Sequence, residues 1–154
     1  MLRVFAVLVL LWPWPALAEN LAGIASIIDG DTVEIHGERI RLYGIDAPES
    51  RQNCKRDGQP WRCGKDAAFA LADKIASKPV ECTSKGKPDR YGRTVAVCRL
   101  AGEDLNAWMV SQGWALAYRQ YSRDYVPQEN EAKEAKRGVW ASEFIPPWEW
   151  RRKK

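Results

Sequence analysis

Three carboxylates stand where predicted strands begin or end. Asp31 opens the second of three short strand candidates, and Asp46 and Glu49 follow the third. When consecutive strands pair as a meander, the start of one lies beside the end of the next, so we expect Asp31 and Asp46 to converge. Two neighbouring carboxylates repel each other and are costly to desolvate, and a hard divalent cation relieves both effects. Because the candidate ligands are all oxygens, calcium is the expected cation. A surface acidic cluster in turns is the alternative interpretation of the same spacing.

Two arginines add phosphate chemistry to this group. Arg41 lies in the third strand candidate, shortly before Asp46, and Arg93 lies across the predicted sheet, after Tyr91 and Gly92. Guanidinium groups bind phosphate oxygens in bidentate fashion. Carboxylates that hold a metal, together with two arginines at one face of a sheet, suit the cleavage of a phosphodiester bond.

Other chemical motifs fail on spacing. The stretch that begins at Asp29 resembles the start of an EF-hand loop, but Val33 occupies the fifth position and the sixth is not glycine. A phosphate-loop pattern before Lys65 has five residues between its glycines, and Asp66 stands where Ser or Thr is required. The single histidine, His36, lies in a predicted hairpin turn, and one histidine excludes mechanisms that need a pair.

Hydrophobic alternation and turn signals place these residues on a β-rich fold. The predicted strands are residues 21–28, 31–35, 38–43, 79–83 and 94–100, and residues 46–62 are predicted to form a loop. The predicted helices are residues 64–77, 104–112 and 128–137, the last two ended by glycines. Five strands with one helix between the third and the fourth, then two more helices, is the order of an OB-type barrel of the α+β class.

The C-terminal tail, residues 146–154, reads PPWEWRRKK and is both aromatic and basic. We interpret it as a packed end with a solvated terminus. An accessory contact to phosphate is the alternative.

Length and composition indicate one domain. The chain has 154 residues, 45% of them hydrophobic, and a formal charge of +4, which permits a polyanionic partner without demanding one. Residues 1–18 combine one arginine, an apolar run, two prolines and a final Ala-Leu-Ala, the pattern of a secretory signal peptide cleaved after Ala18. A membrane anchor is the alternative, but the apolar run is about half the roughly 20 residues that a span needs. We therefore predict a signal peptide at 1–18 and one domain at 19–154.

The four cysteines agree with export. An even number in a small exported domain predicts two disulfides, and the absence of a CxxC spacing argues against zinc ribbons and thioredoxin-type redox chemistry. Cys82 and Cys98 are symmetric about Arg90, so an antiparallel hairpin would set them opposite each other. This predicts the pairs Cys54–Cys63 and Cys82–Cys98.

Three separated motifs, in order and at compatible spacings, resemble the staphylococcal nuclease (thermonuclease) family. They are IDGDTV at 28–33, RLYGIDAPE at 41–49 and DRYGR at 89–93, and the GWA and GVW triplets near residues 114 and 139 extend the match over most of the domain. The resemblance implies a five-stranded OB barrel with three helices. It also implies an exported, calcium-dependent nuclease that acts on DNA and RNA.

The resemblance also assigns roles to residues. It implies that Asp31 and Asp46 are carboxylate ligands of calcium and that Ala47 supplies a backbone carbonyl, although the family usually has threonine there. The remaining roles are phosphate binding and stabilisation of the transition state by Arg41 and Arg93, activation of water by Glu49, and substrate contacts by Tyr91 and, less directly aligned, by Tyr118. The four cysteines depart from the founding enzyme and fit an exported subgroup.

These roles imply cleavage with little sequence preference, because phosphate contacts carry no base information. Aromatic side chains that stack on bases favour single-stranded DNA or RNA. We expect a monomer that has no membrane contact once the signal peptide is removed. The competing hypothesis is a non-catalytic OB-fold module that binds nucleic acid, and the joint presence of the acids and arginines argues against it.

Overall fold

The computed structural model describes residues 19–153. The predicted signal peptide, residues 1–18, lies outside the described residues. Within the described part, no helix has the length and apolar character needed to cross a membrane.

The main sheet is built from seven strands. They are β1 (Asn20–Ile24), β2 (Ser26–Asp29), β3 (Thr32–Ile35), β4 (Glu38–Leu42), β8 (Pro79–Ser84), β9 (Thr94–Leu100) and β10 (Glu103–Asp104). The paired order is β1-β8-β9-β4-β3-β2, with β10 added to β9; β4 and β9 are parallel and all other pairs are antiparallel. The two ends of this path, β1 and β2, are the two halves of the first predicted strand, separated at Ala25. Among the described residues β1 and β2 are not paired with each other, so the hydrogen-bonded sheet does not close.

Local sequence explains the meander. The β3–β4 turn is made by His36 and Gly37, which have φ angles of 51° and 79°, as a tight hairpin turn requires. Along β3 and β4 the buried side chains include Val33, Ile35 and Ile40, which are almost completely buried in the core. Apolar side chains on the inner face therefore fix the register that places the ends of these strands.

Two small sheets lie beside the main one. β5 (Ile45–Asp46) pairs with β11 (Leu116–Ala117), and β6 (Cys54–Arg56) pairs with β7 (Gln59–Trp61). The prediction of an uninterrupted loop over residues 46–62 is therefore wrong. The hairpin forms because Asp57 and Gly58 both adopt positive φ in a tight turn, and a disulfide joins Cys54, at the start of β6, to Cys63, two residues after β7.

Four α-helices occur in the described chain: α1 (Cys63–Ile75), α2 (Leu105–Ser111), α3 (Val126–Glu134) and α4 (Pro147–Arg152), with a 3₁₀ turn, η1 (Gly138–Ala141), after α3. α1 buries Ala67, Leu71 and Ile75, which recur every four residues on one face. Asp104 is the N-cap residue of α2, and its side chain accepts a hydrogen bond from the amide of Ala107. The prediction of three helices is wrong because α4 forms in the C-terminal tail.

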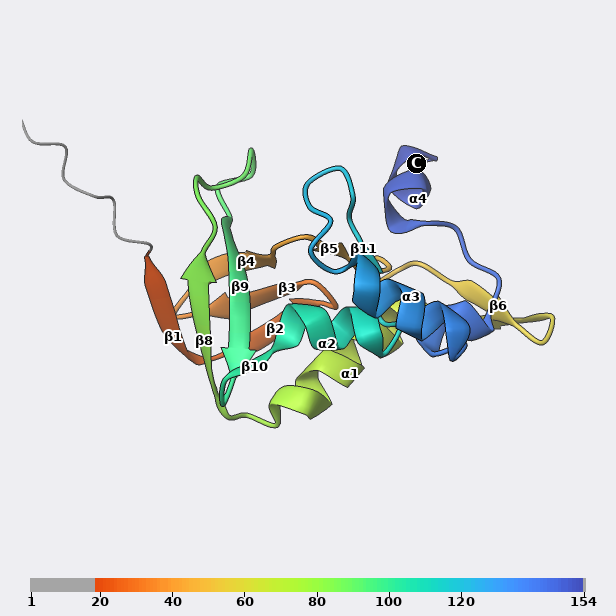
Figure 1. Cartoon of the computed structure of the whole chain (residues 1–154), viewed down its shortest axis with the longest axis horizontal. Coiled ribbons are helices and arrows are strands. Elements are labelled where there is room, and N and C mark those ends of the chain that lie inside the picture. Colours follow the sequence, from red (N-terminus) through yellow and green to blue (C-terminus); the bar gives the residue numbers. More distant parts are fainter. Residues whose placement is uncertain (1–18, 154) are drawn as a thin grey trace, which may run out of the picture.

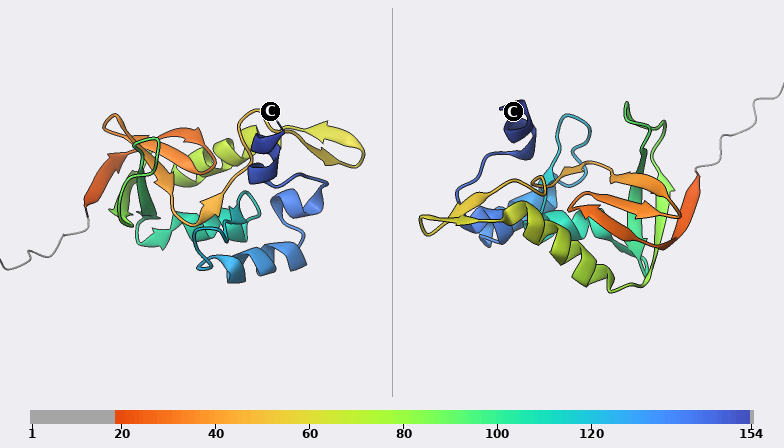
Figure 2. Two further views of the ribbon diagram at one scale, coloured as in Figure 1. Left: turned by 90° about the horizontal axis from the view of Figure 1, so that it is seen from above. Right: turned by 180° about the vertical axis from the view of Figure 1, so that it is seen from behind.

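Figure 1 shows the sheet at one end of the molecule, with α1 and α2 beneath it and α3 and η1 beyond them. The β8–β9 loop, the loop between β11 and α3, and α4 all project from the same edge, as the view from behind also shows (Figure 2). A second apolar cluster, away from the main core, surrounds Cys54, Cys63, Leu116 and Val139 and includes Trp148 of α4.

The structure contains both predicted disulfides, Cys54–Cys63 and Cys82–Cys98. Cys82 and Cys98 are direct partners in the register of β8 and β9. Each bridge closes a short loop and restricts the unfolded chain.

Candidate active site

The strands bring Asp31 and Asp46 to one place. Asp31 immediately precedes β3, and Asp46 ends β5, directly after β4. One carboxylate oxygen of Asp31 accepts a hydrogen bond from the amide of Ala47 at 2.8 Å, and the other accepts one from the Thr32 hydroxyl at 2.9 Å. Nη2 of Arg41 lies 3.3 Å from Asp31 Oδ2 and 3.0 Å from Asp46 Oδ1, so one guanidinium joins the two acids. Asp46 is completely buried and Asp31 is 6% exposed.

Glu49 lies in the loop that follows β5, and this loop is held by a buried glutamine. Gln52 accepts a hydrogen bond from the Glu49 amide at 3.3 Å and donates one to the carbonyl of Ile145 at 2.7 Å. The first turn of α1 packs against the same loop so closely that a Cβ at Gly64 would lie 1.7 Å from the Glu49 carbonyl oxygen. The backbone of Glu49 is thus tightly positioned, while its side chain remains about one-third exposed.

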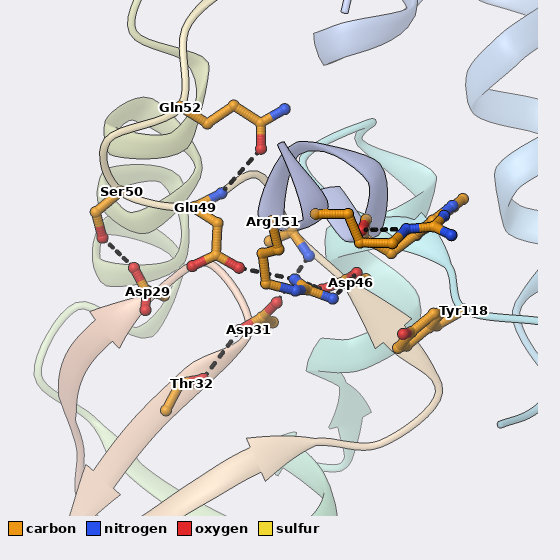
Figure 3. Close-up of polar contacts among 12 residues, drawn as sticks. Asp29, Asp31, Thr32, Asp46, Glu49, Ser50, Gln52, Tyr118 and Arg151 are labelled. Carbon is orange, nitrogen blue, oxygen red and sulfur yellow. Dashed lines mark hydrogen bonds and ion pairs between the residues drawn. The ribbon is translucent and has the colours of Figure 1, made fainter. Parts of the chain in front are cut away.

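Arg151 of α4 reaches into this acidic group, between Asp46 and Glu49 (Figure 3). Its Nη1 donates to Asp46 Oδ1 at 3.0 Å and to Glu49 Oε1 at 2.7 Å, and its Nη2 donates to Asp46 Oδ2 at 2.8 Å. Both oxygens of Asp46 are therefore bound by Arg151, and one is shared with Arg41.

Arg93 interacts with its own loop. It donates from Nε to Asp89 Oδ2 at 2.8 Å, while Asp89 Oδ1 accepts from the amides of Tyr91 and Arg93. The Tyr91 side chain is 66% exposed, with the guanidinium of Arg93 5.3 Å from its ring centre. Among the described residues, the ion pair of Arg93 is with Asp89 and not with the acids around Arg41. The structure thus brings Arg41 to the carboxylates but leaves Arg93 in the β8–β9 loop.

Tyr118 follows β11 on the other side of the acids. Its amide donates to the carbonyl of Gly44, and its ring stacks on Trp148 with centres 5.4 Å apart and an interplanar angle of 8°. Tyr121 meets the same tyrosine ring edge-on at 4.9 Å. A shallow groove at this position is lined by residues of the β11–α3 loop and of α4, namely Ala117, Tyr118, Arg119, Gln120, Trp148 and Arg152.

Residues 39–142 match the family described as Staphylococcal nuclease homologue. An endonuclease of Escherichia coli O157:H7, described as uncharacterized, is 36% identical over 153 residues, which cover 94% of each chain. This chain belongs to the staphylococcal nuclease family. Micrococcal nuclease of Shigella flexneri is 36% identical over 167 residues, covering 97% of this chain and 90% of its own. Succinoglycan biosynthesis protein ExoI of Rhizobium meliloti is 42% identical over 130 residues, covering 82% and 68% respectively.

The electrostatics of this staphylococcal nuclease relative reflect the crowding of its acids. The pKa of Asp46 is raised to about 6, mainly by burial and also by the charge of Asp31, although Arg151 and Arg41 oppose this shift. Burial alone would lower the pKa of the Arg151 guanidinium, but its hydrogen bonds to Asp46 and Glu49 raise it. The acidic group therefore requires positive charge, and here two arginines supply it.

The side chains at this site suit a hard cation. The side-chain donors are the carboxylate oxygens of Asp31 and Asp46, and oxygen donors are what calcium prefers. Within residues 19–153, no group of three or more His, Cys, Asp or Glu side chains has the geometry of a complete metal site. A cation at Asp31 and Asp46 therefore needs ligands from water and substrate, and it would replace the positive charge that Arg151 now supplies.

Sequence reasoning missed Gln52, Gly64, Trp148 and Arg151. Gln52 lies in a polar stretch that looks like any surface loop, and Gly64 looks like an ordinary start of a helix. For Arg151 a signal existed: the tail is basic and aromatic, and a phosphate contact was one of its two interpretations. Its actual partners are the acids of the site.

Proposed function

We propose that this protein is a calcium-dependent nuclease that hydrolyses phosphodiester bonds of DNA and RNA with little sequence preference. The observation that carries the proposal is the buried group of Asp31, Arg41 and Asp46, with Glu49 beside it. Burying two acids is costly, and a binding module has no use for it. The names of the nuclease relatives support the same reaction.

In this proposal Asp31, Asp46 and the carbonyl of Ala47 hold calcium. When bound, the cation reduces the negative charge on a phosphate oxygen of the substrate. Arg41, fixed beside both acids, binds a phosphate oxygen through its remaining donors. Glu49 is more exposed than the metal ligands, and it orients the attacking water or accepts its proton.

Arg93 stabilises the negative charge that develops on the non-bridging phosphate oxygens in the transition state. To do so, it has to exchange Asp89 for the substrate, and the pentacoordinate transition state, which carries more negative charge than the phosphodiester, is a stronger partner for a guanidinium than a single carboxylate. In this proposal the exposed ring of Tyr91 and the ring of Tyr118 contact the nucleotide, which favours single-stranded substrates.

We further propose that residues 1–18 are a signal peptide and that residues 19–154 act outside the cytoplasm as a monomer without membrane contact. Two disulfides suit an oxidising compartment. A non-catalytic OB-fold module remains the competing function, and it predicts affinity for nucleic acid without cleavage.

The direct test is cleavage of a single-stranded DNA and a single-stranded RNA by the purified protein in calcium, in magnesium and with a calcium chelator. We expect calcium to support much faster cleavage than magnesium, because a site with few protein ligands is irregular and magnesium demands near-octahedral geometry. Binding without cleavage in every condition would favour the module. Equal rates in magnesium, or rates that survive the chelator, would contradict the calcium assignment.

A further inference from the structure

The C-terminal helix α4 touches two parts of the proposed site at once. Arg151 binds the acids Asp46 and Glu49, and Trp148 stacks on Tyr118. Trp148 and Arg151 are three residues apart, so both project from one face of the helix. A single short helix therefore contacts both the acids Asp46 and Glu49 and the ring of Tyr118 beside them.

The arrangement of Arg151 resembles that of a bound cation. Its guanidinium lies between the two acids, and it uses both oxygens of Asp46 as well as one of Glu49. A divalent cation at Asp46 needs at least one of these oxygens, and its charge repels a nearby guanidinium. Arg151 in its present position and a cation on Asp46 are thus mutually exclusive.

Trp148 and a nucleobase stacked on the same face of Tyr118 are also mutually exclusive. The two rings are nearly parallel and in contact, so the face of Tyr118 that meets Trp148 is covered. A base can stack on that face only after the indole has moved, because two rings in contact leave no space for a third.

The helix α4 is short, and few of its side chains are buried. Pro147 is the only residue of this six-residue helix that is buried, and the other members are half-buried or exposed. A helix this short is not stable by itself, so its seating depends on tertiary contacts. Arg151 contacts the acids of the proposed site, whereas Trp148 contacts Tyr118 and also packs against the second apolar cluster.

We propose that α4 is an autoinhibitory segment: Arg151 competes with the divalent cation for Asp46 and Glu49, and Trp148 covers the base-stacking face of Tyr118. This inference rests on the proposed function. When a cation is bound at Asp46, Arg151 is displaced, and the helix then moves away from Tyr118 and uncovers its ring. The cation is thereby both a ligand of the site and the signal that opens it.

The test measures calcium affinity by isothermal titration calorimetry in the full chain, without substrate. Arg151→Gln should bind calcium about tenfold more tightly than the wild type, because the closed state no longer competes. Arg151→Lys, which keeps the charge but loses the two-pronged contact, should fall between them. Arg152→Gln is the matched control, since it removes the same charge from the next position and should leave the affinity within about twofold of wild type.

Hydrogen exchange of the peptide containing residues 147–153 supplies a second readout. In the wild type, calcium should accelerate exchange in this peptide, whereas Arg151→Gln should exchange quickly with or without calcium. Equal calcium affinity of the wild type and Arg151→Gln, or a helix that stays protected in saturating calcium, would overturn autoinhibition and leave the nuclease proposal standing. Failure of all variants to bind calcium would overturn both proposals.

Discussion

Arg41 and Asp46 form an ion pair of 3.0 Å in which the aspartate is completely buried and the arginine side chain is 13% exposed. The same guanidinium also lies beside Asp31, so the positive charge of Arg41 stabilises two acids that would otherwise repel each other. This pair links β4 to β5 and fixes the relative positions of the proposed metal ligands and the proposed phosphate-binding group.

Replacing Arg41 tests how much the fold depends on this pair. Arg41→Gln should lower the free energy of unfolding by about 3 kcal/mol in the presence of a chelator, because it removes the guanidinium that neutralises both buried carboxylates and leaves only Arg151 beside Asp46. Arg39 lies on the same strand but its side chain is 62% exposed, so Arg39→Gln should cost less than about 1 kcal/mol. Urea denaturation of both variants measures the difference, and similar losses would contradict the structural role of Arg41.

Glu49→Gln separates catalysis from binding. If Glu49 acts on water, its replacement should reduce kcat by roughly 10²–10⁴-fold while the affinity for single-stranded DNA changes little. Steady-state kinetics and fluorescence anisotropy with a labelled oligonucleotide give the two quantities, and circular dichroism controls for folding. Full turnover by this variant would remove Glu49 from the mechanism.

Gly64→Ala should displace the Glu49 loop. The added methyl group would lie 1.7 Å from the Glu49 carbonyl oxygen, and neither backbone can yield without moving the loop or the helix. We expect a loss of about 1–3 kcal/mol in stability together with a fall in kcat. Lys65→Ala, at the neighbouring position of α1, should have little effect on stability. A Gly64→Ala variant as stable as wild type would show that the contact relaxes freely.

The ion pair and hydrogen bonds of Asp89 predict that this residue contributes to stability in a pH-dependent way. Burial tends to raise the pKa of Asp89, but hydrogen bonds from Arg93 and Tyr91 outweigh it and hold the pKa below the usual 3.8. An acid whose pKa is lowered by folding stabilises the protein above its unfolded pKa, and this stabilisation disappears as the pH falls through the lowered value. Asp89→Asn should therefore reduce the free energy of unfolding at pH 7 by about 1 kcal/mol, with a smaller difference from wild type near pH 3.

Thermal or urea unfolding at the two pH values checks this expectation. A difference between Asp89→Asn and wild type that stays constant over this pH range would mean that the charge of Asp89 contributes nothing to the loop.

Local patterns in the sequence determined much of this protein. Alternating apolar residues gave the meander of β2, β3 and β4, and a four-residue apolar repeat gave α1, because these periods follow directly from backbone geometry. Hairpin symmetry was sufficient to pair Cys82 with Cys98, since register in an antiparallel hairpin is set by its turn. The convergence of Asp31 and Asp46 followed from the same logic.

Only the tertiary structure decided what closes over those acids. Arg151 is 105 residues from Asp46 in the sequence, and Tyr118 and Trp148 come from separate loops and helices. Residues 147–152 lack the apolar periodicity that predicts a helix, yet they form α4. Arg93 forms an ion pair with Asp89 of its own loop instead of with the acids around Arg41. Such contacts depend on how segments that are distant in the sequence pack against each other, and local sequence patterns do not determine that packing.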